Sequence, residues 1–564
     1  MIGYVCKYAP VEVLRVMGAD PVLMEPSVAD FNLADTLMHP NICSYAKSVL
    51  EEIAGKNYEG IVLTSCCDSI RRLCDTLRAR YPQKFVWMLD VPRYATDAAA
   101  ALYAGEIRKM IEAYGAFSGK TFDQDALRQM LLCNAEDFRP DVKPDGTAPL
   151  RVALMGNRCA NGLRNLLADC GAEVVSDLTC TGVERKFRPP RTDEELLTDY
   201  ARQLLQQVPC LRMADTASRD ERIGLIAQQA DGVIYHTVKF CDIYSYEYAV
   251  LRDKLNIPVL KVETDTTRQC EGQIRTRVEA FLEALAAAKG LQPIRPAAGK
   301  RGEKHMTVVG IDSGSTSTNA VVMNEKKEIL ASGSIRTGAK TSDSAAKILA
   351  DILQKAGLPR EKVDLIVSTG YGRVSIPFAD RSVTEISCHG KGARYFDPKV
   401  RTILDIGGQD SKAIRLNEAG EVEDFVMNDK CAAGTGRFLE AMARTLELEI
   451  SELGPVALKS TEAVEISSMC TVFAESEVIS LIARNQEKAD IANGVHRAIA
   501  GKAYSLLSRV GPEPEFMMTG GVARNPGVVR AVEEKLGAKL FLCEDPEFVG
   551  AVGAALFGLE SLGA

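Results

Sequence analysis

The sequence predicts an α/β protein built from two dissimilar halves, and three features of the chain support this class. Short apolar runs alternate with helical patterns in the first half, as expected for a parallel sheet with crossover helices. Residues 286–306 are rich in Ala, Pro, Gly and Lys and lack apolar periodicity, which is typical of a linker. The next stretch, TVVGIDSGSTSTNAVVM (307–323), looks like the beginning of an independent protein. We therefore expect one part over residues 1–285, a linker at 286–305 and a second part over 306–564.

The composition is that of a globular protein and narrows the possible functions. Of 564 residues, 46% are hydrophobic and 26% are charged, which suits three or four domains with sizeable cores. The net charge of −8 disfavours a general nucleic-acid binder, because neutralising phosphates needs a basic face. No apolar run approaches the roughly 18 residues of a membrane span. The first residues, MIGYVCKYAPVEVL, lack the pattern of a secretion signal, so we expect a cytoplasmic protein that binds no membrane.

The first half contains five candidate strands, each a short apolar run. They are GIVLTS (60–65), FVWMLD (85–90), RVALMG (151–156), GVIYHT (232–237) and PVLKVE (258–263). Helical patterns lie between them, for example at 101–115 and 246–255. A polar segment with prolines at 137–149 divides this half into lobes of about 1–140 and 150–285. Each lobe should be a small doubly wound, Rossmann-like unit whose functional residues follow the carboxyl ends of its strands.

Sixteen cysteines are unusual for a protein expected in a reducing compartment. Twelve precede residue 300, and the other four are Cys388, Cys431, Cys470 and Cys543. Because structural disulfides are rare in such compartments, metal binding or redox chemistry is the leading explanation for some of these thiols. The rest should be inert buried thiols, since free cysteine behaves as a small hydrophobic residue.

Three glycine-containing turns follow apolar strands in the second half. They are IDSGSTSTNAVV (311–322), ILDIGGQDSKAI (403–414) and MTGGVARNPGVV (518–529). Backbone N–H groups and hydroxyls in such turns can surround phosphate oxygens, and Asp312 is placed to hold a hydrated Mg²⁺. Taken singly, each turn could equally be structural.

Together and in this order, the three turns resemble the two phosphate loops and the adenosine loop of the superfamily of acetate and sugar kinases, Hsp70 and actin. STGYGR (368–373) and EFVGAVGAALFG (547–558) resemble its connecting segments. The resemblance covers about residues 306–560 and implies two ribonuclease-H-like lobes that close over ATP and Mg²⁺. It implies that Asp312 and Gln409 position Mg²⁺ and water for hydrolysis. The implied ATP-binding residues are Asp312, Ser313, Gly314, Ser315, Thr316, Ser317, Asp405, Gly407, Gly408, Gln409, Asp410, Gly434, Gly520, Gly521 and Asn525.

Two cysteine segments narrow the choice within this superfamily. DKCAAGTGRFLE (429–440) and SSMCTVFAESEVISL (467–481) resemble the cluster segments of the ATP-dependent activators of 2-hydroxyacyl-CoA dehydratases and benzoyl-CoA reductases. The resemblance implies that Cys431 and Cys470 hold half of a [4Fe–4S] cluster. Because a [4Fe–4S] cubane needs four thiolate ligands and each chain would supply two, a homodimer would complete the cluster. The alternative is that both are buried thiols beside a nucleotide pocket.

Four segments of the first half resemble the cluster-bearing component of the same dehydratase and reductase systems. They are YVCKYAPVEVLRVMGADPVLM (4–24), NICSYAKS (41–48), TSCCDSIRRL (64–73) and VKFCDIYSYE (238–247). The resemblance implies that Cys43, Cys67 and Cys241 bind a [4Fe–4S] or a double-cubane cluster. A double cubane needs about six thiolates, and the possible additional ligands are Cys6, Cys66, Cys159 and Cys180. No role is expected for Cys74, Cys133, Cys170, Cys210 and Cys270.

These resemblances imply an ATP-hydrolysing iron–sulfur enzyme that transfers low-potential electrons. A ferredoxin-like or flavodoxin-like donor would reduce the bridging cluster, and the electron would pass to the centre of the first half. The substrate would be an acyl-CoA, as in a 2-hydroxyacyl-CoA dehydratase, or a small molecule. The cluster component is compact, single and fused to its activator, which favours a small-molecule reductase of the double-cubane type. One alternative is an Hsp70-like or kinase-like ATPase with an unrelated binding module. Another is an activation or maturation factor that passes electrons to a separate dehydratase.

Overall fold

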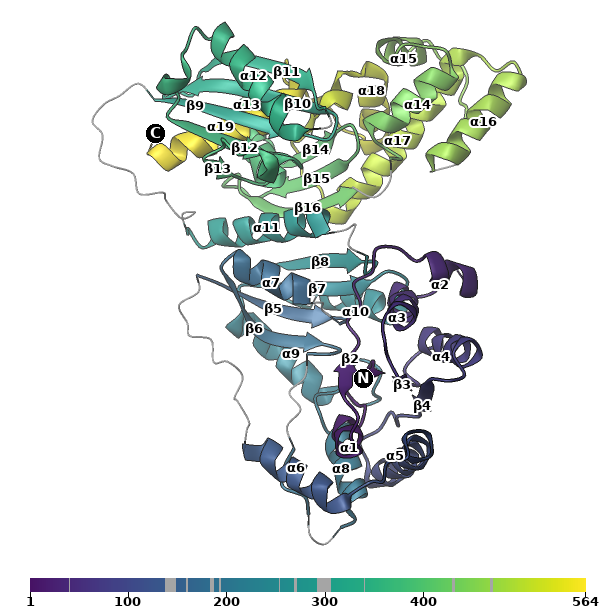
Figure 1. Cartoon of the computed structure of the whole chain (residues 1–564). Helices are drawn as coiled ribbons and strands as arrows, with labels where there is room; N and C mark the ends of the chain where they lie inside the picture. Colours follow the sequence, from purple (N-terminus) through teal and green to yellow (C-terminus); the bar gives the residue numbers. More distant parts are fainter. Residues whose placement is uncertain are drawn as a thin grey trace. The chain divides into compact units, whose positions relative to one another are not determined.

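The computed structural model divides into two compact units, Met1–Leu285 and Ala286–Ala564, which are described separately (Figure 1). It describes residues 1–39, 41–136, 149–158, 161–182, 187–191, 194–252, 254–267, 271–291, 306–338, 340–428, 432–466 and 470–563. The predicted boundary between the two N-terminal lobes therefore lies almost wholly outside the described residues, and so does most of the predicted linker.

The first lobe of unit 1 is a four-stranded parallel sheet in the order β2-β1-β3-β4. Its strands are β1 (Ile2–Tyr4), β2 (Pro21–Leu23), β3 (Gly60–Thr64) and β4 (Phe85–Leu89). Its helices are α1 (Val11–Val16), α2 (Asn32–Leu37), α3 (Ser44–Gly55), α4 (Asp68–Arg80), α5 (Asp97–Ser118) and α6 (Gln124–Glu136). The central strand β3 is fully buried because crossover helices cover the sheet, whereas the edge strand β2 is only half-buried.

The second lobe repeats this architecture with a parallel sheet in the order β6-β5-β7-β8. Its strands are β5 (Leu150–Gly156), β6 (Ala172–Thr179), β7 (Gly232–Val238) and β8 (Val259–Thr264). Its helices are α7 (Asn161–Asp169), α9 (Ala217–Gln229), α10 (Asp242–Arg252) and α11 (Glu271–Ala288), whereas α8 (Leu196–Leu205) packs against α5 of the first lobe. The prediction of two doubly wound lobes is confirmed.

All five predicted strands form, and β1, β2 and β6 were not predicted. The first two have only three residues each, too few to show a pattern. Strand β6, with the sequence AEVVSDLT, lies at the edge of its sheet, where polar residues such as Ser176 and Asp177 interrupt the apolar run. The predicted helix 246–255 is α10, which begins earlier, at Asp242, and ends at Arg252.

The two lobes of unit 1 share one hydrophobic core. Leu63 of the first lobe and Tyr235 of the second belong to the same cluster of buried side chains. The Arg158 guanidinium of the second lobe donates to the Met24 carbonyl of the first at 3.0 Å and also to the Val5 carbonyl. The lobes are therefore fixed to each other, and residues from both can build one site.

Unit 2 contains two five-stranded sheets with the same topology, β11-β10-β9-β12-β13 and β16-β15-β14-β17-β18. In each, three antiparallel strands are followed by parallel ones, which is the ribonuclease-H-like arrangement predicted for this half. The first sheet contains β9 (Thr307–Ser313), β10 (Ser317–Asn324), β11 (Ile329–Arg336), β12 (Leu365–Thr369) and β13 (Arg381–Ser382). The second contains β14 (Thr402–Ile406), β15 (Ser411–Leu416), β16 (Val422–Asn428), β17 (Phe516–Thr519) and β18 (Leu540–Phe541).

Helices cover both faces of these sheets (Figure 1). Helices α12 and α19 pack against the first sheet, while α13 contacts α19 and the second sheet. The helices of this unit are α12 (Thr341–Lys355), α13 (Glu385–Phe396), α14 (Gly436–Thr445), α15 (Ile450–Ala457), α16 (Thr471–Ala483), α17 (Lys488–Val510), α18 (Pro526–Leu536) and α19 (Val549–Leu562). No helix in the described ranges combines the length and apolarity that crossing a bilayer requires.

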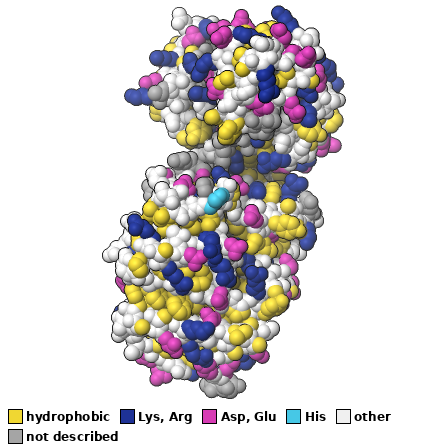
Figure 2. Space-filling model, turned by 90° about the vertical axis from the view of Figure 1, so that its right-hand side faces the viewer, with side chains coloured by type: hydrophobic (Ala, Val, Ile, Leu, Met, Phe, Trp, Pro, Cys, Tyr) yellow, Lys and Arg dark blue, Asp and Glu magenta, His cyan; other side chains and the backbone are white. Residues whose placement is uncertain are grey.

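Acidic and basic side chains are interspersed over the face shown in Figure 2, with apolar patches between them. This distribution agrees with a composition of 68 basic and 76 acidic residues.

Candidate functional site

A cavity of about 380 Å³ in unit 1 is lined by seven cysteines. Their side chains come from both lobes and from segments up to 235 residues apart in the sequence, since the outermost two are Cys6 and Cys241. The seven are Cys6, Cys43, Cys66, Cys67, Cys180, Cys210 and Cys241.

The doubly wound topology brings these thiols together. Cys6 follows β1, Cys66 and Cys67 follow β3, Cys180 follows β6, and Cys241 follows β7. The carboxyl ends of parallel strands meet at one edge of a sheet, and ligands bind there in open α/β folds. Two of the cysteines, Cys43 and Cys67, also stand directly before the first residues of α3 and α4.

Mutual electrostatic effects link six of the thiols in two groups of three. Burial and then the neighbouring thiols of Cys43 and Cys67 raise the pKa of Cys241 to about 11. Burial likewise raises the pKa of Cys180 to about 11, to which its neighbours Cys210 and Cys6 contribute. The first group is therefore Cys43, Cys67 and Cys241, and the second is Cys6, Cys180 and Cys210.

The seventh thiol, Cys66, is hydrogen-bonded to its neighbour Cys67. This bond lowers the pKa of Cys67 to about 5 and raises the pKa of Cys66 well above its ordinary value. The Arg212 guanidinium donates to the Cys66 carbonyl and further stabilises the Cys67 thiolate. A thiolate before a helix and beside a cation is the form of cysteine that binds metals.

The thiols that line the cavity fit an iron–sulfur group. Within the described ranges, no three His, Cys, Asp or Glu side chains converge closely enough to hold a single metal ion. The thiols instead surround a space larger than one ion, as a multi-atom cluster would need.

Most of the cysteines predicted for this centre line the cavity. The structure brings Cys43, Cys67, Cys241, Cys6, Cys66 and Cys180 together, while Cys159 lies outside the described residues. Cys210 was given no role from the sequence, yet its side chain lines the same cavity. It lies in the loop between α8 and α9, so no strand-end pattern marks it.

In unit 2, the first two glycine turns meet across the duplicated sheets. Asp312 lies in β9 and Asp405 in β14, and His389 of α13 stands between them. The His389 Nε2 atom is 4.0 Å from Asp312 Oδ2, and its Nδ1 atom is 3.7 Å from Asp405 Oδ1. The Lys412 Nζ atom lies 3.0 Å from Asp405 Oδ2 and 2.6 Å from Asp410 Oδ2.

The two central carboxyl groups have different proton affinities. Burial raises the pKa of Asp312 to about 6. Burial also opposes ionisation of Asp405, but His389 and Lys412 outweigh it and lower the pKa of Asp405 to about 2. Sequence reasoning did not single out His389 or Lys412, although Lys412 is part of the second turn.

Small residues keep the space around these carboxylates open. A Cβ atom on Gly408 would lie 2.1 Å from Thr316 Oγ1, and one on Gly370 or Gly550 would lie 2.4 Å from an Asp312 oxygen. The Thr316 Oγ1 atom is buried and has no hydrogen-bond partner among the described residues. Two carboxylates, close glycine backbone and an unpaired hydroxyl fit Mg²⁺ and a phosphate chain.

The remaining residues predicted for ATP binding lie on or beside the glycine turns. Near the carboxylates, Gly520 has a φ of +84°, and a Cβ atom there would lie 2.8 Å from Asp405 Oδ1. Asn525 caps α18, because its Oδ1 atom accepts from the N–H groups of Gly527 and Val528. Ser313 ends β9 and Ser317 begins β10, Gly434 lies before α14, and the others follow strands in the glycine turns, namely Gly314, Ser315, Gly407, Gln409, Asp410 and Gly521.

The described parts of the two cysteine segments of unit 2 lie at α14 and α16. Cys431 lies outside the described residues. Cys470 is exposed and immediately precedes α16, which packs against α14. Helix α16 also exposes large apolar side chains close to Cys470, since Val472 is 66% and Phe473 67% exposed.

The duplicated ribonuclease-H-like sheets give the second unit the fold of the actin and sugar-kinase class, joined in this chain to a cysteine-rich doubly wound unit. The chain belongs to the BadF/BadG/BcrA/BcrD ATPase family, which it matches over residues 309–558. Residues 6–137 and 131–285 match the 2-hydroxyglutaryl-CoA dehydratase D-component. One polypeptide thus combines a dehydratase-type component with an activator-type ATPase.

Characterised relatives match the ATPase part. The chain is 43% identical to the 2-hydroxyisocaproyl-CoA dehydratase activator of Clostridioides difficile, over 45% of this chain and 96% of the relative. It is 46% identical to the (R)-2-hydroxyglutaryl-CoA dehydratase activating ATPase of Acidaminococcus fermentans, again over 45% and 96%. Among solved structures, component A of the Acidaminococcus fermentans (R)-2-hydroxyglutaryl-CoA dehydratase is 43% identical, with a TM-score of 0.45, over 46% of this chain and all of that one.

Proposed function

We propose that this protein is an ATP-driven, low-potential electron-transfer enzyme whose unit 1 reduces or dehydrates a substrate. The observation that carries this proposal is the cavity lined by seven thiols in the same chain as an activator-type ATPase. An activator or maturation factor that serves a separate dehydratase would not need such a cavity of its own.

The thiols of unit 1 would hold an iron–sulfur centre. Two groups of three thiols would suit a double cubane, which needs about six thiolate ligands, whereas a single [4Fe–4S] cluster takes at most four and would leave at least three of the seven thiols unused. When bound, such a centre supplies single electrons at low potential. Arg212 and Arg158 line the same cavity and would offset the negative charge of the thiolates.

Cys431 and Cys470 would hold half of a bridging [4Fe–4S] cluster in each of two copies of the chain. Cys470 is exposed before the N-terminus of α16, where backbone N–H groups and the helix dipole favour negative charge. The exposed apolar side chains of Val472 and Phe473 give this end of the helix a surface suited to a second copy. A homodimer would therefore supply four thiolates.

Hydrogen bonds connect the second nucleotide turn to the segment that follows Cys431. The Gly436 and Arg437 N–H groups each donate at 2.9 Å to the carbonyls of Gly407 and Gly408. The Ser411 hydroxyl donates at 2.7 Å to the Gly434 carbonyl. A movement of this turn on nucleotide hydrolysis would therefore move the start of α14.

The nucleotide chemistry follows from the same turns. Asp312 and Asp405 would hold hydrated Mg²⁺, and the exposed Gln409 would orient the attacking water. A ferredoxin-like or flavodoxin-like protein would supply electrons, and the acceptor would be an acyl-CoA or a small molecule. Iron and inorganic sulfide counts on anaerobically purified chain test the whole proposal. Roughly eight irons from unit 1 and two from unit 2 are expected for a double cubane and a shared cluster, and protein free of sulfide would refute it.

Replacing Cys470 with serine should remove the bridging cluster without affecting nucleotide binding. The variant should lose about two irons per chain, half of one shared [4Fe–4S] cluster. Equilibrium binding of Mg·ATP should stay unchanged, because Cys470 belongs to neither nucleotide turn. Cys543→Ser is the matched control and should keep its iron. Full iron content in Cys470→Ser would contradict the assignment.

Replacing Ser411 with alanine should uncouple ATP hydrolysis from electron transfer. The variant loses one buried hydrogen bond to the segment that follows Cys431, worth about 1 kcal/mol. Electrons delivered to a dye acceptor per ATP hydrolysed should fall by about fivefold, while hydrolysis itself continues. The control Ser508→Ala removes an exposed hydroxyl that bonds within its own helix. An unchanged electron-to-ATP ratio in Ser411→Ala would show that these contacts do not transmit the nucleotide state.

A further inference from the structure

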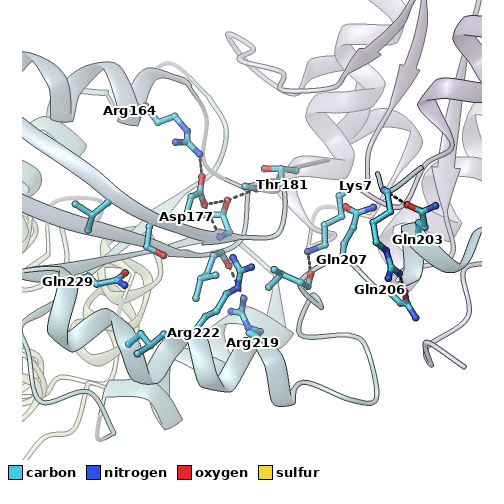
Figure 3. A pocket seen from close by; sticks show the side chains of 18 residues that line it. Lys7, Arg164, Asp177, Thr181, Gln203, Gln206, Gln207, Arg219, Arg222 and Gln229 are labelled. Atoms are coloured by element: carbon cyan, nitrogen blue, oxygen red, sulfur yellow. Dashed lines mark hydrogen bonds and ion pairs between the residues drawn. The ribbon is translucent and has the colours of Figure 1, made fainter. Parts of the chain in front are cut away.

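Unit 1 contains a second and larger cavity of about 900 Å³. It lies along the edge strand β6 and is bordered by residues of α7, α8 and α9 and by Lys7 of the first lobe. Figure 3 shows Arg219 and Arg222 on one side of this cavity and Lys7 and Gln207 on the other. The volume is within the range of cavities that bind cofactor-sized molecules.

The wall of this cavity is polar and cationic. Only four of its 18 lining residues are apolar, namely Val175, Leu178, Val208 and Leu225. Among the described lining residues, five are basic and one is acidic, although the whole chain has a net charge of −8. The basic residues are Lys7, Arg164, Arg188, Arg219 and Arg222.

Two of these basic residues are neutralised by carboxylates. Arg164 is ion-paired with Asp177, the one acidic residue of the wall, whose Oδ1 atom also accepts from the N–H and hydroxyl of Thr179. Arg219 is paired with the buried Glu247 at 2.7 Å. Because Asp177 is paired with Arg164, it does not neutralise the other basic residues of the wall.

Arg188 and Arg222 keep their charge available to a ligand. The Arg188 guanidinium donates to the neutral amide of Gln206 at 2.9 Å, and among the described residues no carboxylate pairs with it. Arg222 is exposed on α9 and has no hydrogen-bond or ion-pair partner in the described part of the chain. Two guanidinium groups on the wall of one cavity can hold carboxylate or phosphate oxygens in pairs.

A buried amide points to the same kind of ligand. Both polar atoms of the Gln207 side chain are buried and lack a hydrogen-bond partner among the described residues. Leaving such atoms unpaired costs free energy, so a polar ligand that completes their hydrogen bonds would be stabilised there. Gln207 lines the cavity directly.

Lys7 lines the large cavity and directly follows a residue that lines the thiol-lined cavity. Its ammonium group is almost buried, donates at 2.6 Å to the Val208 carbonyl and lines the large cavity. The preceding residue, Cys6, lines the thiol cavity, and so does Cys180, which stands between Thr179 and Thr181 of the large cavity. A ligand in the large cavity would therefore lie beside the second group of thiols.

We propose that the large cavity is the substrate site of unit 1 and that it binds a molecule carrying carboxylate or phosphate groups through Arg188, Arg222 and Gln207. Calling the ligand a substrate rests on the proposed function, but the assignment of an anion-binding site does not. The oxyanions could belong to the phosphates of a coenzyme A ester or to the carboxylates of a small acid. A purely hydrocarbon ligand does not match this wall.

Isothermal titration of the full chain with coenzyme A, glutarate and inorganic phosphate separates these sources. Saturating Mg·ADP keeps the nucleotide turns of unit 2 occupied during each titration. At least one probe should bind, and the double variant Arg188→Gln/Arg222→Gln should weaken that binding about tenfold or more, as expected for lost charged hydrogen bonds. Both residues are exposed, so these changes should leave folding intact. The control is Arg15→Gln, which removes an equally exposed charge from α1, away from the cavity.

Binding of coenzyme A alone would assign the phosphates of a coenzyme A ester, and binding of glutarate alone would assign a small acid. The site assignment is overturned if no probe binds the wild-type chain. It is also overturned if the double variant binds as tightly as Arg15→Gln. Iron content is measured on the same samples to test the proposed function separately from the anion site. A chain that lacks iron but still binds the anion refutes only the proposed function.

Discussion

Replacing Lys412 with methionine should lower the free energy of unfolding of unit 2 by about 3–5 kcal/mol, the usual cost of breaking a buried ion pair, and abolish ATP hydrolysis. Lys412 is 5% exposed and contacts the carboxylates of Asp405 and Asp410. Without the ammonium group, two negative charges remain close together in a poorly solvated place. Urea unfolding followed by circular dichroism measures the first effect, and phosphate release measures the second.

A second substitution separates the loss of stability from the loss of ATP hydrolysis. In the double variant Lys412→Met/Asp405→Asn, the buried carboxylate that lost its partner is also removed. The double variant should therefore be more stable than Lys412→Met, because the two residues are energetically coupled. Hydrolysis should not return, since Asp405 is a proposed Mg²⁺ ligand. If the two single substitutions are simply additive in stability, the ion pair does not have the role described.

Replacing Cys67 with serine should remove the iron of unit 1 and abolish substrate turnover while leaving ATP hydrolysis unchanged. Cys67 is the thiol with the lowered pKa, about 5, and it stands before the first residue of α4. Serine oxygen is a poor replacement for thiolate at iron. Iron analysis should then find only the share of the bridging cluster, and full iron content would remove Cys67 from the site.

Cys210→Ser distinguishes the two possible centres of unit 1. A double cubane uses both groups of three thiols, so this variant should lose iron, whereas a single [4Fe–4S] cluster on the other group should survive. Cys133→Ser is the matched control, because Cys133 is an exposed cysteine of unit 1 outside the cavity. Iron loss in the control would point to general damage rather than to loss of a ligand.

The fold was largely predictable because apolar runs mark buried strands. Strands such as β3 and β7 are buried on both faces, so their sequences are continuous apolar runs. The short strands β1 and β2 have no such run, and β6 is polar because it lies at an edge. The repeated order of the sheets in unit 2 followed from the resemblance to a superfamily rather than from periodicity.

The residues of the two candidate sites were predictable only where they follow strands and lie in segments that resemble a known family. Cys67 and Cys241 are of this kind, whereas Cys210 reaches the same cavity from a loop that only tertiary packing places there. His389 lies in the middle of a helix, and its position between Asp312 and Asp405 depends on how α13 packs between the two sheets. No local sequence pattern reports such long-range contacts.

In the proposed homodimer, the apolar end of α16 would make the stability of unit 2 depend on protein concentration. Val472 and Phe473 can leave water only when another surface covers them, so in the proposed homodimer part of the stability of unit 2 comes from association. By mass action, the midpoint of thermal unfolding of this unit would then rise with protein concentration, while that of unit 1 would not. At low abundance in a cell, unit 2 would then be less stable than at high abundance.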